Sequence, residues 1–191
     1  MTIPGKIFVF SAASGAGKTT LLDYVRSIFP NVVYSISATT RQPRAGEING
    51  VHYFFLSEEA FKTKRDQGAF AEWANVHGHF YGTPKSFIDE TIAGGKHIIM
   101  DIDVFGKKQF DVSYPTAIGI LVLPPSLPLL EQRLRLRNTD NEAVIQLRLE
   151  NAQKEMEFAR TQGKYEFTVV NNDLEKAKIE VTAIIRNAID G

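Results

Sequence analysis

The amino-acid sequence predicts an α/β fold in which helices flank a parallel sheet. Four apolar runs of strand length mark the predicted strands: 7–11, 97–103, 118–123 and 167–170. Near-continuous apolar runs are typical of parallel strands, because helices cover both faces of such a sheet. A helical pattern at 18–29 follows the first run, and another, ending near 137, follows the third. This alternation of strands and helices indicates a parallel sheet.

The carboxyl-terminal part of the chain continues this pattern. A polar segment that contains arginines begins at 138 and leads into a long helix that ends near 161. After the last predicted strand, Asp173 stands where its side chain can cap a final helix. We therefore expect the chain to end on a helix that packs against the sheet.

Composition and charge narrow the class of protein. The 191 residues include 22 basic and 22 acidic side chains, a balance that argues against a broad surface for nucleic acid or membranes. The chain has no cysteine, which is compatible with a reducing compartment. The first six residues show no signal-peptide pattern and no apolar run reaches 18 residues, so we expect a cytoplasmic protein. This length suits one domain with lobes or two very small domains.

The region from about 35 to 95 differs in character from the rest of the chain. Short β-like pieces alternate there with turn signals, and two helical patterns fit between them. The β-like pieces are 33–36, 52–55 and 69–73, and the helical patterns are 57–67 and 84–93. We expect this region to form a lobe inserted into the core that carries the parallel sheet.

A glycine-rich turn joins the first predicted strand to the first predicted helix. Its residues are Ser14, Gly15, Ala16, Gly17, Lys18, Thr19 and Thr20. Glycines let backbone N–H groups converge on phosphate oxygens, and the helix N-terminus adds free donors and a positive dipole. In this context the Gly-Lys-Thr pattern predicts an ATP-binding P-loop, with Lys18 reaching the β- and γ-phosphates and the Thr19 hydroxyl facing Mg²⁺. A turn that only caps a helix is the alternative, and Lys-Thr at this offset after a strand argues against it.

Asp101 ends an apolar run on the carboxyl side of a predicted strand. In nucleotide kinases and hydrolases an aspartate in this place organises Mg²⁺, directly or through water. Capping of the following helix is the alternative role. We expect Thr19 and Asp101 to organise the metal together.

Two arginines, Arg41 and Arg44, lie three residues apart around a proline. The residues between them are neutral, so the segment is not a solvated basic run. Paired guanidinium groups suit a phosphate dianion, because each can bind two oxygens. Two unrelated surface arginines are the alternative.

Taken together, these segments resemble the guanylate kinases over nearly the whole chain. The matching segments follow that family's order and spacing: 14–21, 37–47, 50–54, 72–74, 81–83, 101–104, 133–137, 148–149 and 170–174. The segment 37–47 is the most specific, because other P-loop proteins lack it. The resemblance implies a P-loop NTPase core (1–34, 96–137 and 160–191), an inserted mixed α/β GMP-binding lobe (35–95) and a helical lid (138–159).

The resemblance also implies the reaction, which transfers the γ-phosphoryl group of ATP to GMP with Mg²⁺ and yields ADP and GDP. The implied GMP-binding residues are Ser37, Arg41, Arg44, Tyr53, Glu72, Tyr81, Thr83 and Asp103. The two arginines and two tyrosines would hold the phosphate of GMP. Glu72 would accept hydrogen bonds from the adjacent N1–H and N2–H₂ donors of guanine, a pair that adenine lacks.

Catalytic roles are implied for four basic residues: Lys18, Arg41, Arg137 and Arg148. The last two match lid arginines that close over the transferring phosphoryl group. The P-loop residues 14–20 and Asn171 match the ATP side of the site. We expect GMP and ATP as the partners of a monomer or small homo-oligomer.

Two other functions are compatible with this fold. A related P-loop kinase could act on a phosphorylated sugar, but Ser37, Glu72 and Thr83 favour a guanine base. A guanylate-kinase-like module could bind phosphopeptides without catalysis, but the intact P-loop lysine and Asp101 favour an enzyme.

The chain departs from the family pattern at a few positions. Ala12 and Ala13 replace the usual Gly-Pro, Asn138 replaces a glycine and Phe105 replaces a glutamine. An alanine at position 12 requires a negative φ or a slightly different turn. We expect these changes to affect the loop geometry and the turnover rate rather than the kind of reaction, because none of them removes a charged group from the proposed chemistry.

Overall fold

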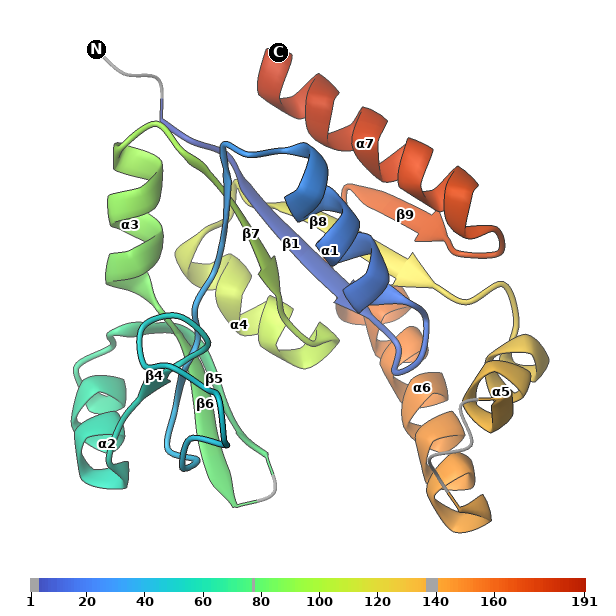
Figure 1. The fold of residues 1–191 in the computed structure, drawn as a ribbon, viewed down its shortest axis with the longest axis horizontal. Helices are drawn as coiled ribbons and strands as arrows, with labels where there is room; N and C mark the ends of the chain where they lie inside the picture. The colour runs from blue at the N-terminus through green and yellow to red at the C-terminus, as the bar shows by residue number, and fades with distance from the viewer. Residues whose placement is uncertain (1–3, 77, 137–140) are drawn as a thin grey trace.

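The structure, a computed structural model, describes residues 4–76, 78–136 and 141–191, which fold around two sheets (Figure 1). The larger sheet has five strands in the order β2-β7-β1-β8-β9. These strands are β2 (Val32–Tyr34), β7 (His97–Asp101), β1 (Ile7–Ala12), β8 (Ile118–Leu123) and β9 (Phe167–Val170). All four pairings are parallel, which confirms the predicted fold class. The carboxyl ends of the strands therefore meet at one edge of the sheet.

Helices cover both faces of this sheet. Successive strand residues point to opposite faces, so each strand contributes side chains to two cores. Phe8 and Phe10 of β1 pack against α1 (Lys18–Ile28) and α7 (Leu174–Asp190). Ile7 and Val9 point the other way and share a core with α3 (Lys85–Ala93) and α4 (Val104–Ser113). The helices on this second face are α3, α4 and α6 (Glu142–Gln162). Asp173 caps α7 as predicted, accepting hydrogen bonds from the amides of the first helical turn.

The smaller, four-stranded sheet forms most of the inserted region. Its order is β4-β3-β6-β5, with strands β4 (Phe54–Phe55), β3 (Ala38–Thr39), β6 (His79–Pro84) and β5 (Phe70–Val76). The helix α2 (Glu58–Asp66) covers it, and the ring of Phe61 stacks on Phe70 and Phe80 at centroid distances of 4.4 and 5.4 Å. This stack gives the lobe a core of its own beside the larger sheet.

Three elements were not expected from the sequence: the strands β3 and β6 and the helix α4. The strand β6 was not predicted, because Gly82 and Pro84 read as turn residues, yet it pairs with both β3 and β5. The helix α4 was also missed, and the predicted strand 97–103 ends at Asp101. The reason is Asp103, whose carboxylate accepts a 2.7 Å hydrogen bond from the Gly106 amide and starts a helix.

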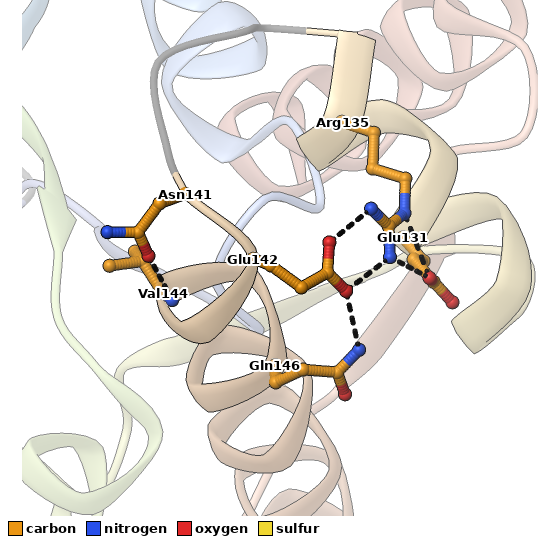
Figure 2. A network of polar contacts seen from close by, with 6 residues as sticks. All are labelled: Glu131, Arg135, Asn141, Glu142, Val144 and Gln146. Atoms are coloured by element: carbon orange, nitrogen blue, oxygen red, sulfur yellow. Dashed lines mark hydrogen bonds and ion pairs between the residues drawn. The ribbon is translucent and has the colours of Figure 1, made fainter.

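The remaining helix, α5 (Leu127–Leu136), lies beside the amino-terminal half of α6 (Figure 1). Arg135 joins the two helices, because its guanidinium contacts both Glu131 of α5 and Glu142 of α6 at 2.6–3.0 Å (Figure 2). Asn141 caps α6 by accepting a hydrogen bond from the Val144 amide. In the described part of the predicted lid, the helix α6 is thus joined to α5 by an ion pair. Among the described residues no helix combines the length and apolar character needed to cross a membrane.

Candidate functional site

The predicted P-loop connects β1, the central strand, to α1. Ala12 is the last residue of β1 and pairs with Val122, so the alanine that replaces the pattern's first glycine sits in extended backbone. The left-handed conformations fall instead on Gly15 and Gly17, with φ values of 88° and 93°. Gly17 is also the N-cap of α1, and no described side chain caps this end of the helix. The first N–H groups of α1 therefore remain available to an anion.

Asn171 holds this loop from the carboxyl end of β9. Its buried side-chain amide donates a 2.8 Å hydrogen bond to the Ala16 carbonyl. A Cβ atom at Gly17 would lie only 2.3 Å from the Asn171 amide nitrogen, so the approach requires glycine. Arg133 donates to the Asn171 carbonyl at 2.8 Å, which ties α5 to the same point. These residues line a pocket of about 420 Å³ next to the loop.

Lys18 and Asp101 form an ion pair at the carboxyl edge of the larger sheet. Asp101 therefore does not act as a helix cap, a role that Asp103 takes two residues later. Thr19 is exposed in the first turn of α1. Within the described residues no three His, Asp or Glu side chains cluster as a metal site. A carboxylate and a hydroxyl beside a phosphate-binding loop nevertheless fit Mg²⁺, which keeps several waters and uses few protein ligands.

The two predicted phosphate-binding arginines lie on the turn between β3 and β4. Arg41 makes a two-pronged ion pair with Glu47, at 2.7 and 2.9 Å, and its guanidinium lies 5.4 Å from the ring centroid of Tyr53. Glu47 also accepts a 2.7 Å hydrogen bond from the Arg44 amide. The Arg41 hydrogen bonds lower the pKa of Glu47 to about 2, so the carboxylate stays charged at neutral pH. Glu47 thereby shapes the turn that carries both arginines.

Glu72 of β5 and Thr83 of β6 face each other across an antiparallel strand pair. The Thr83 hydroxyl donates a 2.5 Å hydrogen bond to the Glu72 carboxylate. Burial raises the pKa of Glu72 to about 7, because the Thr83 bond offsets only part of the desolvation, and Asp103 adds to the shift. A Cβ atom at Gly106 would lie 3.1 Å from a Glu72 oxygen. The lack of a side chain at Gly106 therefore leaves room for the Glu72 carboxylate.

A polar cavity of about 150 Å³ lies between the smaller sheet and the carboxyl edge of the larger one. Four predicted site residues line it: Ser37, Tyr53, Thr83 and Asp101. Tyr81 lies beside it, with its ring 6.1 Å from that of Tyr53. The structure thus brings Ser37 and Thr83, expected beside the base, and Tyr53, expected at the phosphate, to the end of the strand that carries Asp101.

Comparison with known proteins decides the family. The sequence model of the guanylate kinase family matches residues 4–188. A guanylate kinase from Anaeromyxobacter dehalogenans is 48% identical over 186 residues, covering 97% of this chain and 81% of the relative. One from Aromatoleum aromaticum is 44% identical over 184 residues, covering 96% and 89%. The chain belongs to the guanylate kinase family.

A solved structure agrees with this assignment. The crystal structure of guanylate kinase from Anaplasma phagocytophilum superposes with a TM-score of 0.70 at 29% identity, covering 97% of this chain and 87% of that one. The family membership confirms the resemblance inferred from the motifs, and with it an ATP:GMP phosphotransferase on a P-loop NTPase fold.

Arg44 and Arg148, two described residues proposed for the guanylate kinase site, are not among those that line the polar cavity. Arg148 is half-buried on α6, and Arg44 is exposed on its turn. Arg137 lies outside the described residues, as does the family departure at position 138. The roles of these residues, like those of the other proposed site residues, remain predictions.

Three further residues are part of the site and were given no role in the sequence analysis. Glu47 could have been noticed as an acidic residue at the end of the arginine segment. The buried hydroxyl of Ser35 lines the polar cavity and has no hydrogen-bond partner among the described residues. Glu155 accepts a 3.0 Å hydrogen bond from the Ser14 amide of the P-loop. The Glu155 contact joins distant parts of the chain, and Ser35 enters the cavity only through the fold, so no local pattern signals either residue.

Proposed function

We propose that the polar cavity and the P-loop beside it carry out the guanylate kinase reaction, with GMP held by the lobe and ATP by the loop. The observation that supports this most is the convergence of Tyr53, Thr83 and Asp101 around one cavity. An acceptor placed there would present its phosphate toward the edge of the sheet where Lys18 lies. The proposal assigns the base to Glu72, Thr83, Ser37 and Asp103, and the acceptor phosphate to Arg41, Arg44, Tyr53 and Tyr81.

Charge stabilisation and positioning would supply most of the catalysis. Phosphoryl transfer passes through a loose transition state, so the protein mainly aligns the two phosphates and neutralises their charge. Lys18, the P-loop amides and Arg41 would share this task with Arg137 and Arg148. Thr19 and Asp101 would hold Mg²⁺, whose positive charge would offset the negative charge of the ATP phosphates. No general base is needed, because the attacking phosphate of GMP is already an anion.

The pocket beside Gly17 and Asn171 is proposed to take the adenine side of ATP. Asn171 shapes this pocket through its bond to the Ala16 carbonyl. All the proposed contacts come from one chain, in keeping with a monomer or small homo-oligomer. We place the enzyme in the cytoplasm, and its cysteine-free sequence is compatible with a reducing compartment.

A coupled assay of ADP release tests the proposal. ATP and Mg²⁺ are supplied with GMP, AMP, UMP or CMP as acceptor, and we expect rapid turnover with GMP alone. Turnover with a phosphorylated sugar instead would indicate the related kinase. A folded protein that binds GMP but transfers no phosphoryl group would be the non-catalytic module and would refute the proposal.

A further inference from the structure

The P-loop is held by α6 as well as by the strands around it. The Ser14 amide donates a 3.0 Å hydrogen bond to the Glu155 carboxylate, across 141 residues of sequence. The neighbouring Ala13 is buried in an apolar cluster with residues of α5 and α6, among them Ile145 and Ala152. Ser14 therefore donates its amide to α6, and the preceding Ala13 shares an apolar cluster with that helix.

Helical spacing places Glu155 on the same face of α6 as the proposed lid arginine. Arg148 precedes Glu155 by seven residues, which is about two helical turns. The buried residues Ile145 and Ala152 show the same spacing and mark the side of the helix that packs inward. Any shift or rotation of α6 that breaks the Glu155 contact therefore also moves Arg148 relative to the P-loop.

The charges around Glu155 belong to the proposed transfer site. Burial raises its pKa above the usual value, and Asp103 adds to that effect. The Ser14 hydrogen bond and the charge of Lys18 act in the opposite direction and favour the carboxylate. Glu155 thus lies within electrostatic range of the lysine proposed to contact the ATP phosphates.

We propose that Glu155 is a positioning residue for phosphoryl transfer, which sets α6 and its Arg148 against the P-loop through the Ser14 amide. This inference rests on the proposed function of the site. Glu155 does not contact the reacting atoms in this proposal. It fixes the distance and rotation of the lid helix, so its loss reduces the rate of transfer more than the binding of GMP.

Three variants separate this role from a general effect on the helix. Glu155→Ala removes the acceptor, Glu155→Gln keeps an acceptor oxygen without the charge, and Glu157→Gln changes an exposed carboxylate of the same helix that pairs with Arg160. We expect Glu155→Ala to lower kcat about tenfold or more, the size of a lost hydrogen bond to a charged group, with a smaller change in KM for GMP. Glu155→Gln should retain most of the activity, and Glu157→Gln should match the parent enzyme.

Hydrogen exchange gives a readout that does not depend on activity. The Ser14 amide should be protected in the nucleotide-free parent protein and should exchange faster in Glu155→Ala, but not in Glu155→Gln or Glu157→Gln. Unchanged Ser14 protection in Glu155→Ala would overturn the inference, as would an unchanged kcat or an equal loss in Glu155→Gln. A parent protein that fails to phosphorylate GMP would refute the proposed function instead, and the exchange data would still decide whether Glu155 holds the loop.

Discussion

The Arg41 guanidinium and the Glu47 carboxylate meet in a two-pronged ion pair, six residues apart on one turn. Glu47 also accepts a hydrogen bond from the Arg44 amide, so one carboxylate fixes both the Arg41 side chain and the backbone of the turn. A side chain already held in one orientation loses less entropy when it binds a phosphate. The turn is therefore preorganised for an anion, although part of the Arg41 hydrogen-bonding capacity is engaged by Glu47.

Replacing Glu47 tests this preorganisation. Glu47→Gln should raise KM for GMP more than it lowers kcat, because the arginine keeps its charge but loses its fixed orientation. Steady-state kinetics with varied GMP measure the two effects separately. Glu58→Gln is the matched control, since Glu58 forms an exposed ion pair with Lys62 in the same lobe. A KM that falls in Glu47→Gln would mean that the ion pair competes with the substrate.

Lys18 is predicted to act on the phosphates rather than to support the fold. Lys18→Met should lower kcat by several orders of magnitude while the thermal midpoint changes little, since the Asp101 pair is partly exposed and surface pairs contribute little to stability. Single-turnover kinetics and thermal unfolding check the two statements. Near-normal turnover would refute the P-loop assignment.

Selection for guanine should depend on Glu72. Glu72→Gln replaces one acceptor oxygen with a donor, which opposes the N1–H and N2–H₂ donors of the base. We expect a loss of about 1–3 kcal/mol in discrimination between GMP and AMP, the usual size of one paired contact. The ratio of kcat/KM for the two acceptors measures it, and an unchanged ratio would exclude Glu72 from the base pocket.

The raised pKa of Glu72 predicts a pH dependence near neutrality. With a pKa of about 7 the carboxyl is mostly protonated at pH 6 and mostly ionised at pH 8, and only the ionised form accepts both guanine donors. Binding of GMP should therefore weaken about tenfold per pH unit below the pKa. Because GMP also titrates, the measured quantity is the ratio of KM in Glu72→Gln to KM in the parent, which should rise with pH. A flat ratio between pH 6 and 8 would contradict the prediction.

Asn171 should support both stability and ATP binding. Asn171→Ala leaves the buried Ala16 carbonyl without its donor, at a cost of about 1–3 kcal/mol in the free energy of unfolding. The loop should also loosen, so KM for ATP should rise. Urea unfolding and kinetics with varied ATP measure the two effects, with Asn151→Ala on the exposed face of α6 as the control. Equal values for the two variants would show that the Asn171 bond contributes nothing specific.

The elements with strong local signals could be predicted from the sequence. Strands β1, β7 and β8 are near-continuous apolar runs, and Lys18 follows its glycines at the spacing of a P-loop. The two-residue strand β3 and the bulged pairing of β5 could not be predicted, because they depend on partners brought together by the fold.

The candidate site shows the same division. Motifs in the sequence indicated which residues form the site, but they did not indicate which residues each of them contacts in the structure. The Glu155 contact with Ser14 and the pKa of Glu72 depend on burial by distant segments, which a local pattern does not encode.

The bond between Asn171 and Ala16 joins residues 155 positions apart, and Glu155 reaches Ser14 across 141. A ribosome therefore makes the P-loop well before either of its supports. A nascent chain that ends before Glu155 lacks both contacts, and its central strand lacks the full sheet. Nucleotide affinity should therefore arise only after Asn171 has been made, so that ATP binding does not stabilise shorter chains.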